Sequence, residues 1–363
     1  MKEYKDLTIL LSASNSPSIP GIVKCLKENG ERNIRIVGVD MCNDPSSKYV
    51  VDSFYTVPAA NASEYCDIIL DICKKENVNI YFPGISAEVT AITRRKKEFE
   101  EIGVILSVSN QDSVEISNNK LKTYQFLEEN GVNVPDYYPV YSVEDFVEGC
   151  KKFGYPKKPV CLKIVNSSGS RGVRIIDSQK SLYDLFAYEK ANSLYTSYDY
   201  MLTTLKSSQQ LEPMMLLECM HGPEYTVDLL AEKGKVIYEV GRENVISVLS
   251  IAQETVLKYN KIAYETCEAI VSTLMMDGNV GFDFMWNDKN QPVLMDINPR
   301  ITATISVIAA GGVNLVYLRV KQLLGEKLPF CKPIYGTRLK RRYGEIYTDP
   351  EGNLINNFGR LIF

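Results

Sequence analysis

The first third of the chain alternates short apolar runs with amphipathic, helix-like stretches. The apolar runs have the length of buried strands and cover residues 7–12, 34–40, 79–84 and 103–109. Strands that alternate with helices form a parallel sheet with right-handed crossovers. We therefore predict a small doubly wound α/β domain over residues 1–112. Its first loop lacks the G-x-G-x-x-G spacing that a dinucleotide-binding domain needs.

From residue 113 onward the pattern changes to α+β with antiparallel strands. The expected elements are one helix over 113–131, a strand–loop–strand unit over 160–176, three strands within 214–240, a helix over 254–275, and a hairpin over 280–300. The segment before residue 212 is weakly patterned. We place one subdomain at 113–212 and another at 213–363, so the predicted fold class combines α/β and α+β architecture.

Composition narrows the class of protein. The 363 residues include 45% apolar and 24% charged residues, which are values of globular chains, and the net charge is −4 with both signs mixed throughout. This balance argues against a nucleic-acid partner and against a basic membrane-binding patch. The N-terminal segment lacks the apolar region of a signal peptide, and no window reaches membrane-spanning length.

Cysteine and histidine usage gives a further restriction. The nine cysteines are scattered without a Cys-x-x-Cys pair, and His221 is the single histidine. This pattern excludes a zinc finger and argues against a disulfide framework, so we expect a reduced, cytoplasmic protein. One histidine also argues against catalysis by a Ser/His/Asp or Cys/His arrangement.

The last predicted hairpin carries polar residues inside apolar strands. Asp296 and Asn298 stand two apart in VLMDINPR, so they share one face of a strand. A turn at 288–290 brings Asp283 near Asp296, so that one face carries three oxygen ligands. Such a set suits Mg²⁺ or Mn²⁺, and magnesium bound by few protein oxygens completes its shell with phosphate and water. The alternative is that Asp283 faces solvent and Asn298 caps the turn into Pro299.

A second candidate site is the strand–loop–strand unit. Lys163 lies inside the apolar strand VCLKIV, where a lysine is poorly tolerated without an anion. The following loop offers Gly169, Gly172 and Arg171 for contact with phosphates, although it is not a P-loop. The alternative is a lysine that extends to solvent and an ordinary turn.

Four further acidic positions have weaker patterns. In LLECMHGPEYTVD, the residues Glu218, Met220 and Glu224 resemble a linker that passes over a flat ring and offers a carboxylate to a ribose; surface positions on a hairpin are the alternative. Asp40 and Glu88 follow strands of the first domain. We expect each to be a solvated loop carboxylate, with a role in substrate binding left open.

In this order, the pieces resemble the ATP-grasp superfamily. The similarity is greatest to the synthetase modules of the carbamoyl-phosphate synthase large subunit and to single-module carboxylate-amine ligases. It rests on the doubly wound first domain and on four motifs: NNKLKTYQFLEENGVNVP, VCLKIVNSSGSRGV, LLECMHGPEYTVD and GFDFMWNDKNQPVLMDINPR. It implies a pre-grasp domain followed by an ATP-grasp fold of two α+β subdomains.

The resemblance also implies roles for individual residues. The implied ATP contacts are Lys120, Lys163 and the lid Ser168, Gly169, Ser170, Arg171 and Gly172 at the phosphates, Glu218 and Met220 at the adenine, and Glu224 at the ribose. Mg²⁺ (or Mn²⁺) would be bound by Asp283, Asp296 and Asn298. Arg300 would stabilise the transferred phosphoryl group, with Lys163 as the second catalytic cation. The carbamoyl-phosphate synthase modules have Gln where Asp283 stands here.

The activity implied is that of an ADP-forming carboxylate-amine ligase with ATP, a small carboxylate and an amine as substrates. A phosphotransferase in the same fold, a carbamoyl-phosphate-synthase-like module without amine condensation, and a non-catalytic nucleotide-binding subunit are the alternatives. Substrate specificity is expected from Ser14–Pro17, Gly84–Glu88 and the segment after Arg300. The basic run RLKRRY is either a solvated strand or a contact for an anionic substrate. A homodimer is common in the family.

Overall fold

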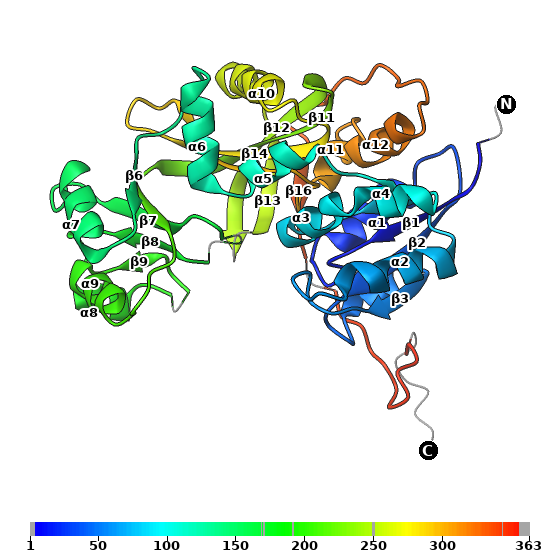
Figure 1. The fold of residues 1–363 in the computed structure, drawn as a ribbon, viewed down its shortest axis with the longest axis horizontal. Helices are drawn as coiled ribbons and strands as arrows, with labels where there is room; N and C mark the ends of the chain where they lie inside the picture. Colours follow the sequence, from blue (N-terminus) through cyan, green and yellow to red (C-terminus); the bar gives the residue numbers. More distant parts are fainter. Residues whose placement is uncertain are drawn as a thin grey trace.

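The computed structural model describes residues 4–355 except Ser168, Ser170, Ala191, Leu249, Ser250 and Tyr343. The described residues form three sheets. The first sheet and the second sheet lie at opposite ends of the elongated molecule, and the third sheet lies between them (Figure 1). Two of the sequence-predicted lid residues, Ser168 and Ser170, therefore lie outside the described residues.

The first sheet is parallel throughout, as predicted, with the strand order β3-β2-β1-β4-β5. Its strands are β1 Leu7–Leu11, β2 Ile34–Asp40, β3 Ser53–Thr56, β4 Ile80–Phe82 and β5 Ile105–Leu106. Its helices are α1 Ile19–Lys27, η1 Ser46–Tyr49, α2 Tyr65–Glu76, α3 Ser86–Arg94 and α4 Lys96–Glu101. The strand order reverses between β1 and β4. The loops that follow these two strands therefore lie where doubly wound sheets bind ligands.

The second sheet has the order β6-β10-β7-β8-β9. Its strands are β6 Tyr137–Val140, β7 Val160–Ile164, β8 Val173–Ile176, β9 Tyr195–Thr196 and β10 Met214–Glu218, with α7 Val143–Lys152, α8 Leu182–Ala187 and α9 Tyr198–Lys206. The antiparallel pairing of β7 with β8 confirms the predicted strand–loop–strand unit. The sheet extends past residue 212, because β10 pairs with both β6 and β7.

The third sheet is antiparallel and has the order β15-β14-β11-β12-β13-β16. Its strands are β11 His221–Glu232, β12 Lys235–Val248, β13 Ile251–Leu257, β14 Gly278–Trp286, β15 Pro292–Asn298 and β16 Arg338–Lys340. The helices of this region are α10 Lys261–Thr273, α11 Ser306–Ala310 and α12 Leu315–Leu323. The predicted hairpin over 280–300 is confirmed as β14 and β15.

Two predicted helices differ from the structure. The segment 113–131 forms two helices, α5 Gln111–Ser117 and α6 Lys120–Glu129, because Asn119 is an N-cap whose side chain accepts a hydrogen bond from the N–H of Lys122. Residues 254–257 belong to β13 and pair with β12, whereas α10 starts at Lys261 after the N-cap Asn260. In both cases a cap residue, which the apolar pattern does not reveal, fixes the start of the helix.

Helix α12 joins the first domain to the third sheet. Its Arg319 donates to Asp277 beside the third sheet (2.7 Å) and to Ser107 after β5 (3.3 Å). Its Lys321 forms an ion pair with Glu31 of the first domain at 2.5 Å. One apolar core contains side chains of β1 and α1 together with α11 and α12. These two parts of the chain therefore pack as one unit.

The second sheet is connected to this unit through α6. Tyr124 and Leu127 are buried in the core that contains β11, β14 and α10. The hydroxyl of Tyr124 also donates to the carbonyl oxygens of Leu294 and Met295 in β15, at 3.2 and 3.1 Å. No helix in the described part of the chain has the length and apolar character needed to cross a membrane.

Candidate active site

Strands β14 and β15 bring the predicted metal ligands together. Asp283 and Asp296 are paired, which confirms that the hairpin brings them close together, and a register shift between Asp283 and Phe284 produces this pairing. The amide of Asn298 donates to Asp283 Oδ2 at 2.8 Å, and the Thr226 hydroxyl donates to Asp283 Oδ1 at 2.7 Å. The two carboxylates and one amide thus occupy one site on the sheet, with a threonine on the neighbouring strand β11.

The charges at this site are concentrated. Removal from water, and then the charge of Glu224, raise the pKa of Asp283 to about 7. Lys120 Nζ lies 3.2 Å from Asp296 Oδ2. Closely spaced carboxylates of this kind are stabilised by a cation. Oxygen donors without sulfur or imidazole fit a hard ion such as Mg²⁺.

This donor set has fewer acids than a typical all-carboxylate metal site. No group of three or more His, Cys, Asp or Glu side chains gathers for metal binding within the described residues. The candidate set instead has two carboxylates and one amide, Asp283, Asp296 and Asn298. It fits a magnesium ion that draws its other ligands from phosphate and water.

Arg300 follows β15 directly and points back toward the same site. Its Nη2 donates to Asn298 Oδ1 at 3.1 Å and its Nη1 to the Ile301 carbonyl at 2.9 Å. Its Nε is buried and has no hydrogen-bond partner among the described residues. Burial lowers the pKa of this guanidinium, whereas the charges of Asp283, Asp296 and Glu88 oppose that shift. Arg300 thus has a donor available for an anion that binds at the site.

A buried network supports the site from behind, and sequence reasoning did not find it. Arg242 donates to Asp228 (2.8 Å), to Asn244 (2.8 Å) and to Thr302 (3.3 Å). Thr302 donates to the other Asp228 oxygen at 2.5 Å. Asn244 in turn donates to Glu224 Oε2 at 3.1 Å. The sequence gives one indication of this network, the acidic Asp228 inside the apolar run TVDLL, and it does not indicate the partners of Asp228.

The lysines and the glycine loop lie next to the hairpin. Lys120 Nζ donates to the Ser167 carbonyl at 2.7 Å, so the same amine contacts the loop and Asp296. Gly169 and Gly172 have φ angles of 64° and 67°, which favour glycine. Arg171 is exposed, and its carbonyl accepts a hydrogen bond from the Ser167 hydroxyl.

Lys163 is half-buried on β7, between β8 and β10. Burial raises the pKa values of the Cys161 and Cys219 thiols, and the nearby charge of Lys163 opposes the rise in both. No hydrogen bond or ion pair holds its amine among the residues that the structure describes. The lysine is therefore available to an anion on this face of the second sheet.

Residues 218–224 connect the second sheet to the third. Glu218 ends β10 and is half-buried, and Met220 is buried in the core beside β11 and β14. Gly222 has a φ of 74°, and the indole of Trp286 donates to the Pro223 carbonyl at 2.9 Å. Glu224, at the end of this linker, lies near Asp283. Burial is the main cause of the raised pKa of Asp283, and the charge of Glu224 is the second cause. The structure thus brings these predicted residues to one edge of the site.

In the first domain, the expectation that Asp40 and Glu88 are solvated is wrong. Both carboxylates are buried. Glu88 accepts hydrogen bonds from the Ser12 hydroxyl at 2.7 Å and from the N–H groups of Gly84 and Ile85 at 3.1 Å. Asp40 accepts from the N–H of Asn15 at 2.7 Å. These bonds shape the loops after β1 and β4, and a buried carboxylate is tolerated because its donors are in place.

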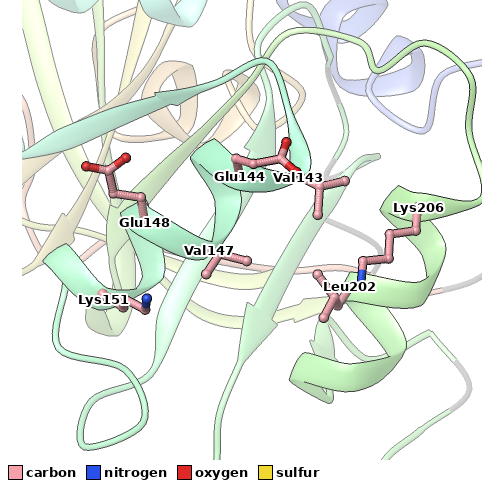
Figure 2. A pocket seen from close by; sticks show the side chains of 7 residues that line it. All are labelled: Val143, Glu144, Val147, Glu148, Lys151, Leu202 and Lys206. Atoms are coloured by element: carbon pink, nitrogen blue, oxygen red, sulfur yellow. The ribbon is translucent and has the colours of Figure 1, made fainter.

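Two cavities lie away from these residues. One, of about 440 Å³, lies between α7 and α9 on the second subdomain, where Val143, Val147 and Leu202 face a shared hollow (Figure 2). The other, of about 520 Å³, lies between the first domain and the third sheet, beside Asn110 and Arg319. Neither is lined by a sequence-predicted site residue.

Two family models match this chain, one in each half. Residues 210–342 match the family model described as ATP-grasp in the biosynthetic pathway with Ter operon. Residues 11–107 match the model described as PylC-like, N-terminal domain. These matches confirm the resemblance to ATP-grasp proteins, and the structure has the ATP-grasp fold preceded by a doubly wound domain.

Individual relatives agree with this class. The carbamoyl phosphate synthase large chain of Clostridium acetobutylicum is 24% identical over 292 residues, covering 77% of this chain and 25% of the relative. The chain therefore spans about a quarter of that relative. The biotin carboxylase domain of Hydrogenobacter thermophilus 2-oxoglutarate carboxylase, solved with MgADP and bicarbonate, has a TM-score of 0.66 at 16% identity, covering 92% of this chain and 73% of the other. The L-amino acid ligase of Bacillus licheniformis has a TM-score of 0.61 at 14% identity, with 89% and 75% covered.

Proposed function

We propose that the protein is an ADP-forming carboxylate-amine ligase that uses ATP and Mg²⁺. The observation that carries this proposal is the position of Lys120, whose amine contacts both the glycine loop at Ser167 and the metal hairpin at Asp296. One cation thus joins the two elements that an ATP triphosphate would have to contact together. The paired carboxylates on the hairpin supply the metal site that such a nucleotide needs.

In this proposal the nucleotide lies between the second and third sheets. The phosphates are bound by Lys120, Lys163 and the loop Ser168, Gly169, Ser170, Arg171 and Gly172. The linker between β10 and β11 contacts the adenine through main-chain groups at Glu218 and Met220. Glu224 binds the ribose. Its half-buried carboxylate is oriented by the amide of Asn244, which supports a specific contact over a solvated surface role.

Asp283, Asp296 and Asn298 would hold the magnesium ion. When bound, this ion neutralises phosphate charge and orients the γ-phosphate for in-line attack. Asn298 bridges Asp283 and Arg300, because its amide nitrogen donates to Asp283 and its oxygen accepts from Arg300. This arrangement positions the arginine for an oxygen of the transferred group.

The reaction then needs no protein nucleophile. The substrate carboxylate attacks the γ-phosphorus and releases ADP, which gives an acyl phosphate, and an amine displaces inorganic phosphate to form the amide. Arg300 and Lys163 stabilise the negative charge that moves onto the transferred group. The glycine loop would exclude water from the acyl phosphate, because hydrolysis of that intermediate wastes ATP.

The relatives support the ligase class over simple nucleotide binding. A carbamoyl phosphate synthase and an L-amino acid ligase are among the proteins with detectable similarity in sequence or fold. Each of the polar positions expected of the class is occupied by a suitable residue here, which argues against a degenerate, non-catalytic subunit. Their particular substrates belong to those proteins.

The test is a product assay with ATP, Mg²⁺ and pools of carboxylates and amines. We expect release of ADP and phosphate together with an amide product, and loss of this release in Asp296→Ala. Formation of AMP and pyrophosphate would contradict the acyl-phosphate route. A stable phosphorylated product in phosphorus NMR, formed without consumption of amine, would instead identify a phosphotransferase.

A further inference from the structure

Arg341, immediately after β16, ties together three segments around the candidate active site. Its guanidinium donates to the carbonyl oxygens of Ala252 at 3.0 Å, Pro17 at 3.0 Å and Ala303 at 2.7 Å. Its own N–H donates to the Gln253 carbonyl at 2.8 Å. The side chain thus spans the first domain, β13 and the segment after Arg300.

Two of these three contacts belong to the surfaces that the fold places at the substrate. Pro17 lies in the loop after β1, at the point where the order of the first sheet reverses. Ala303 lies three residues after Arg300 and next to Thr302, which accepts a hydrogen bond from Arg242. Arg341 therefore contacts the loop after β1 and the segment after Arg300 at the same time.

Arg341 differs from the other arginines near the candidate active site in lacking a nearby negative charge among the described residues. Arg242 is paired with Asp228 at 2.8 Å, and Arg300 lies in the field of Asp283 and Asp296. For Arg341, no carboxylate within 4.0 Å is found among the described residues. Burial and the charge of Arg242 both lower the pKa of its guanidinium. A half-buried cation beside a second cation is costly unless an anion joins it.

The neighbouring residues of β16 show that this imbalance is specific. Arg338 and Lys340 both pair with Glu254, at 3.2 and 3.6 Å, on the exposed side of the strand. The three carbonyl contacts of Arg341 explain how its side chain is oriented but supply no compensating charge. A guanidinium has five N–H donors, so these contacts leave one donor on each terminal nitrogen for a bidentate carboxylate.

We propose that Arg341 binds a substrate carboxylate that survives the reaction. The inference rests on the proposed ligase function and deepens it, because it requires one substrate to carry an anionic group in addition to the carboxylate that is activated. Two substrate classes meet this requirement: an α-amino acid that acts as the amine, or a dicarboxylate that acts as the acid. In either case the amide product retains a negative charge.

The experiment compares each active substrate with its primary amide, in which the retained carboxylate is neutral. Kinetics are measured for the wild type, Arg341→Met, Arg341→Lys and the control Arg338→Met. We expect Arg341→Met to raise KM for the carboxylate substrate by roughly 10- to 100-fold, as for loss of a charge-assisted contact, with a smaller change in kcat. Arg341→Lys recovers part of the loss, and Arg338→Met leaves KM unchanged.

The amide analogue separates binding from a structural role. If Arg341 contacts the carboxylate, the wild type binds the amide poorly and Arg341→Met loses nothing further with it. An equal loss with both forms, together with an unchanged preference for the carboxylate, would overturn the proposal and leave Arg341 as a structural tie. Whether the sensitive carboxylate belongs to the amine or to the acid substrate identifies the class.

Failure of the proposed function is distinguishable from failure of this inference. If the wild type releases no ADP with any pool, thermal shifts are measured with the nonhydrolysable ATP analogue AMP-PNP, Mg²⁺ and the probes glutamate and succinate. A shift in the wild type that Arg341→Met lacks, and that the α-amide of glutamate and succinamate do not produce, supports the anion site alone. No shift, or the same shift in both proteins, rejects it.

Discussion

The two hairpins of the candidate site are built in contrasting ways. In β14 and β15, Asp283, Asp296 and Asn298 all have hydrogen-bond or ion-pair partners, and the intervening apolar side chains lie in a buried core. In β7 and β8, Lys163 has no such partner among the described residues, and the loop turns through Gly169 and Gly172. Lys120 contacts both hairpins.

One half of the site is therefore ordered before any ligand binds. The hairpin of β14 and β15 holds its polar groups in position before any ligand arrives, which lowers the cost of ordering them at the reaction. Between β7 and β8, Gly169 and Gly172 have positive φ angles, and Lys163 has no partner among the described residues. We infer that the metal side is fixed and that the phosphate side completes its contacts when ATP binds.

The largest expected effect is on catalysis, from Asp296→Asn. The change keeps the size of the side chain but removes the charge that pairs with Lys120 and that would bind magnesium, so ADP release is expected to fall by about 10³-fold or more. The control is Asp288→Asn in the turn of the same hairpin, where the carboxylate is exposed. Equal activity of Asp296→Asn and the wild type would exclude this hairpin as the metal site.

A large loss of stability is expected from Arg242→Met. The buried Asp228 would lose its ion-pair partner, which costs on the order of 3 kcal/mol in the free energy of unfolding. Urea denaturation measures this change. Lys158→Met is the control, because its pair with Asp288 is exposed and is expected to contribute less than about 0.5 kcal/mol. Similar losses in both variants would show that the preformed half does not depend on its buried network.

A pH-dependent change in stability is expected from Glu239, on strand β12 of the third sheet. Burial, and then the charge of Glu268, raise the pKa of Glu239 to about 7. The folded protein thus binds this proton more tightly than the unfolded chain, so its stabilisation is complete below the unfolded pKa and is lost as the pH rises through 7.

Glu239→Gln removes this dependence. At pH 8 we expect the variant to be more stable than the wild type by about 1–2 kcal/mol, after allowance for partial exposure, and at pH 4 we expect no such gain. Urea denaturation at the two pH values measures the difference. A constant difference between the proteins from pH 4 to pH 8 would rule out titration of Glu239 as its cause.

The smallest effects are expected at the loop, where two glycines form a matched pair. In Gly172→Ala the added methyl meets the Ile164 side chain at 2.6 Å and the φ is positive, whereas in Gly169→Ala only the φ is unfavourable. We expect a loss of stability of about 1–2 kcal/mol for Gly172→Ala and about 1 kcal/mol for Gly169→Ala. Thermal denaturation measures both. If Gly169→Ala were the more destabilising, packing on Ile164 would not be the controlling factor.

The sequence predicts the β14–β15 hairpin and the shared face of Asp296 and Asn298, because the turn near Asp288 and the period of two are local patterns. The shift between Asp283 and Phe284, which pairs Asp283 with Asp296, has no such pattern. The pairing of Asp228 with Arg242 likewise depends on the register of β11 with β12, which shifts at Leu230. No local pattern contains that shift.

The burial of acidic side chains also could not be predicted from the sequence. Glu88 lies in the first turn of α3, and its carboxylate is enclosed because Ser12, in the loop after β1, and two local N–H groups supply its hydrogen bonds. The break between α5 and α6 was missed for a simpler reason. Asn119 looks polar and unremarkable within an apolar repeat, yet it caps a new helix.

The double attachment of α12 has a consequence for substrate selection. Arg319 and Lys321 fasten the first domain to the third sheet from two sides, so those parts cannot separate without breaking buried ion pairs. In the proposed enzyme, the surface that meets the small substrates is thus held in place before they bind. Discrimination between substrates would then follow shape complementarity to that preformed surface.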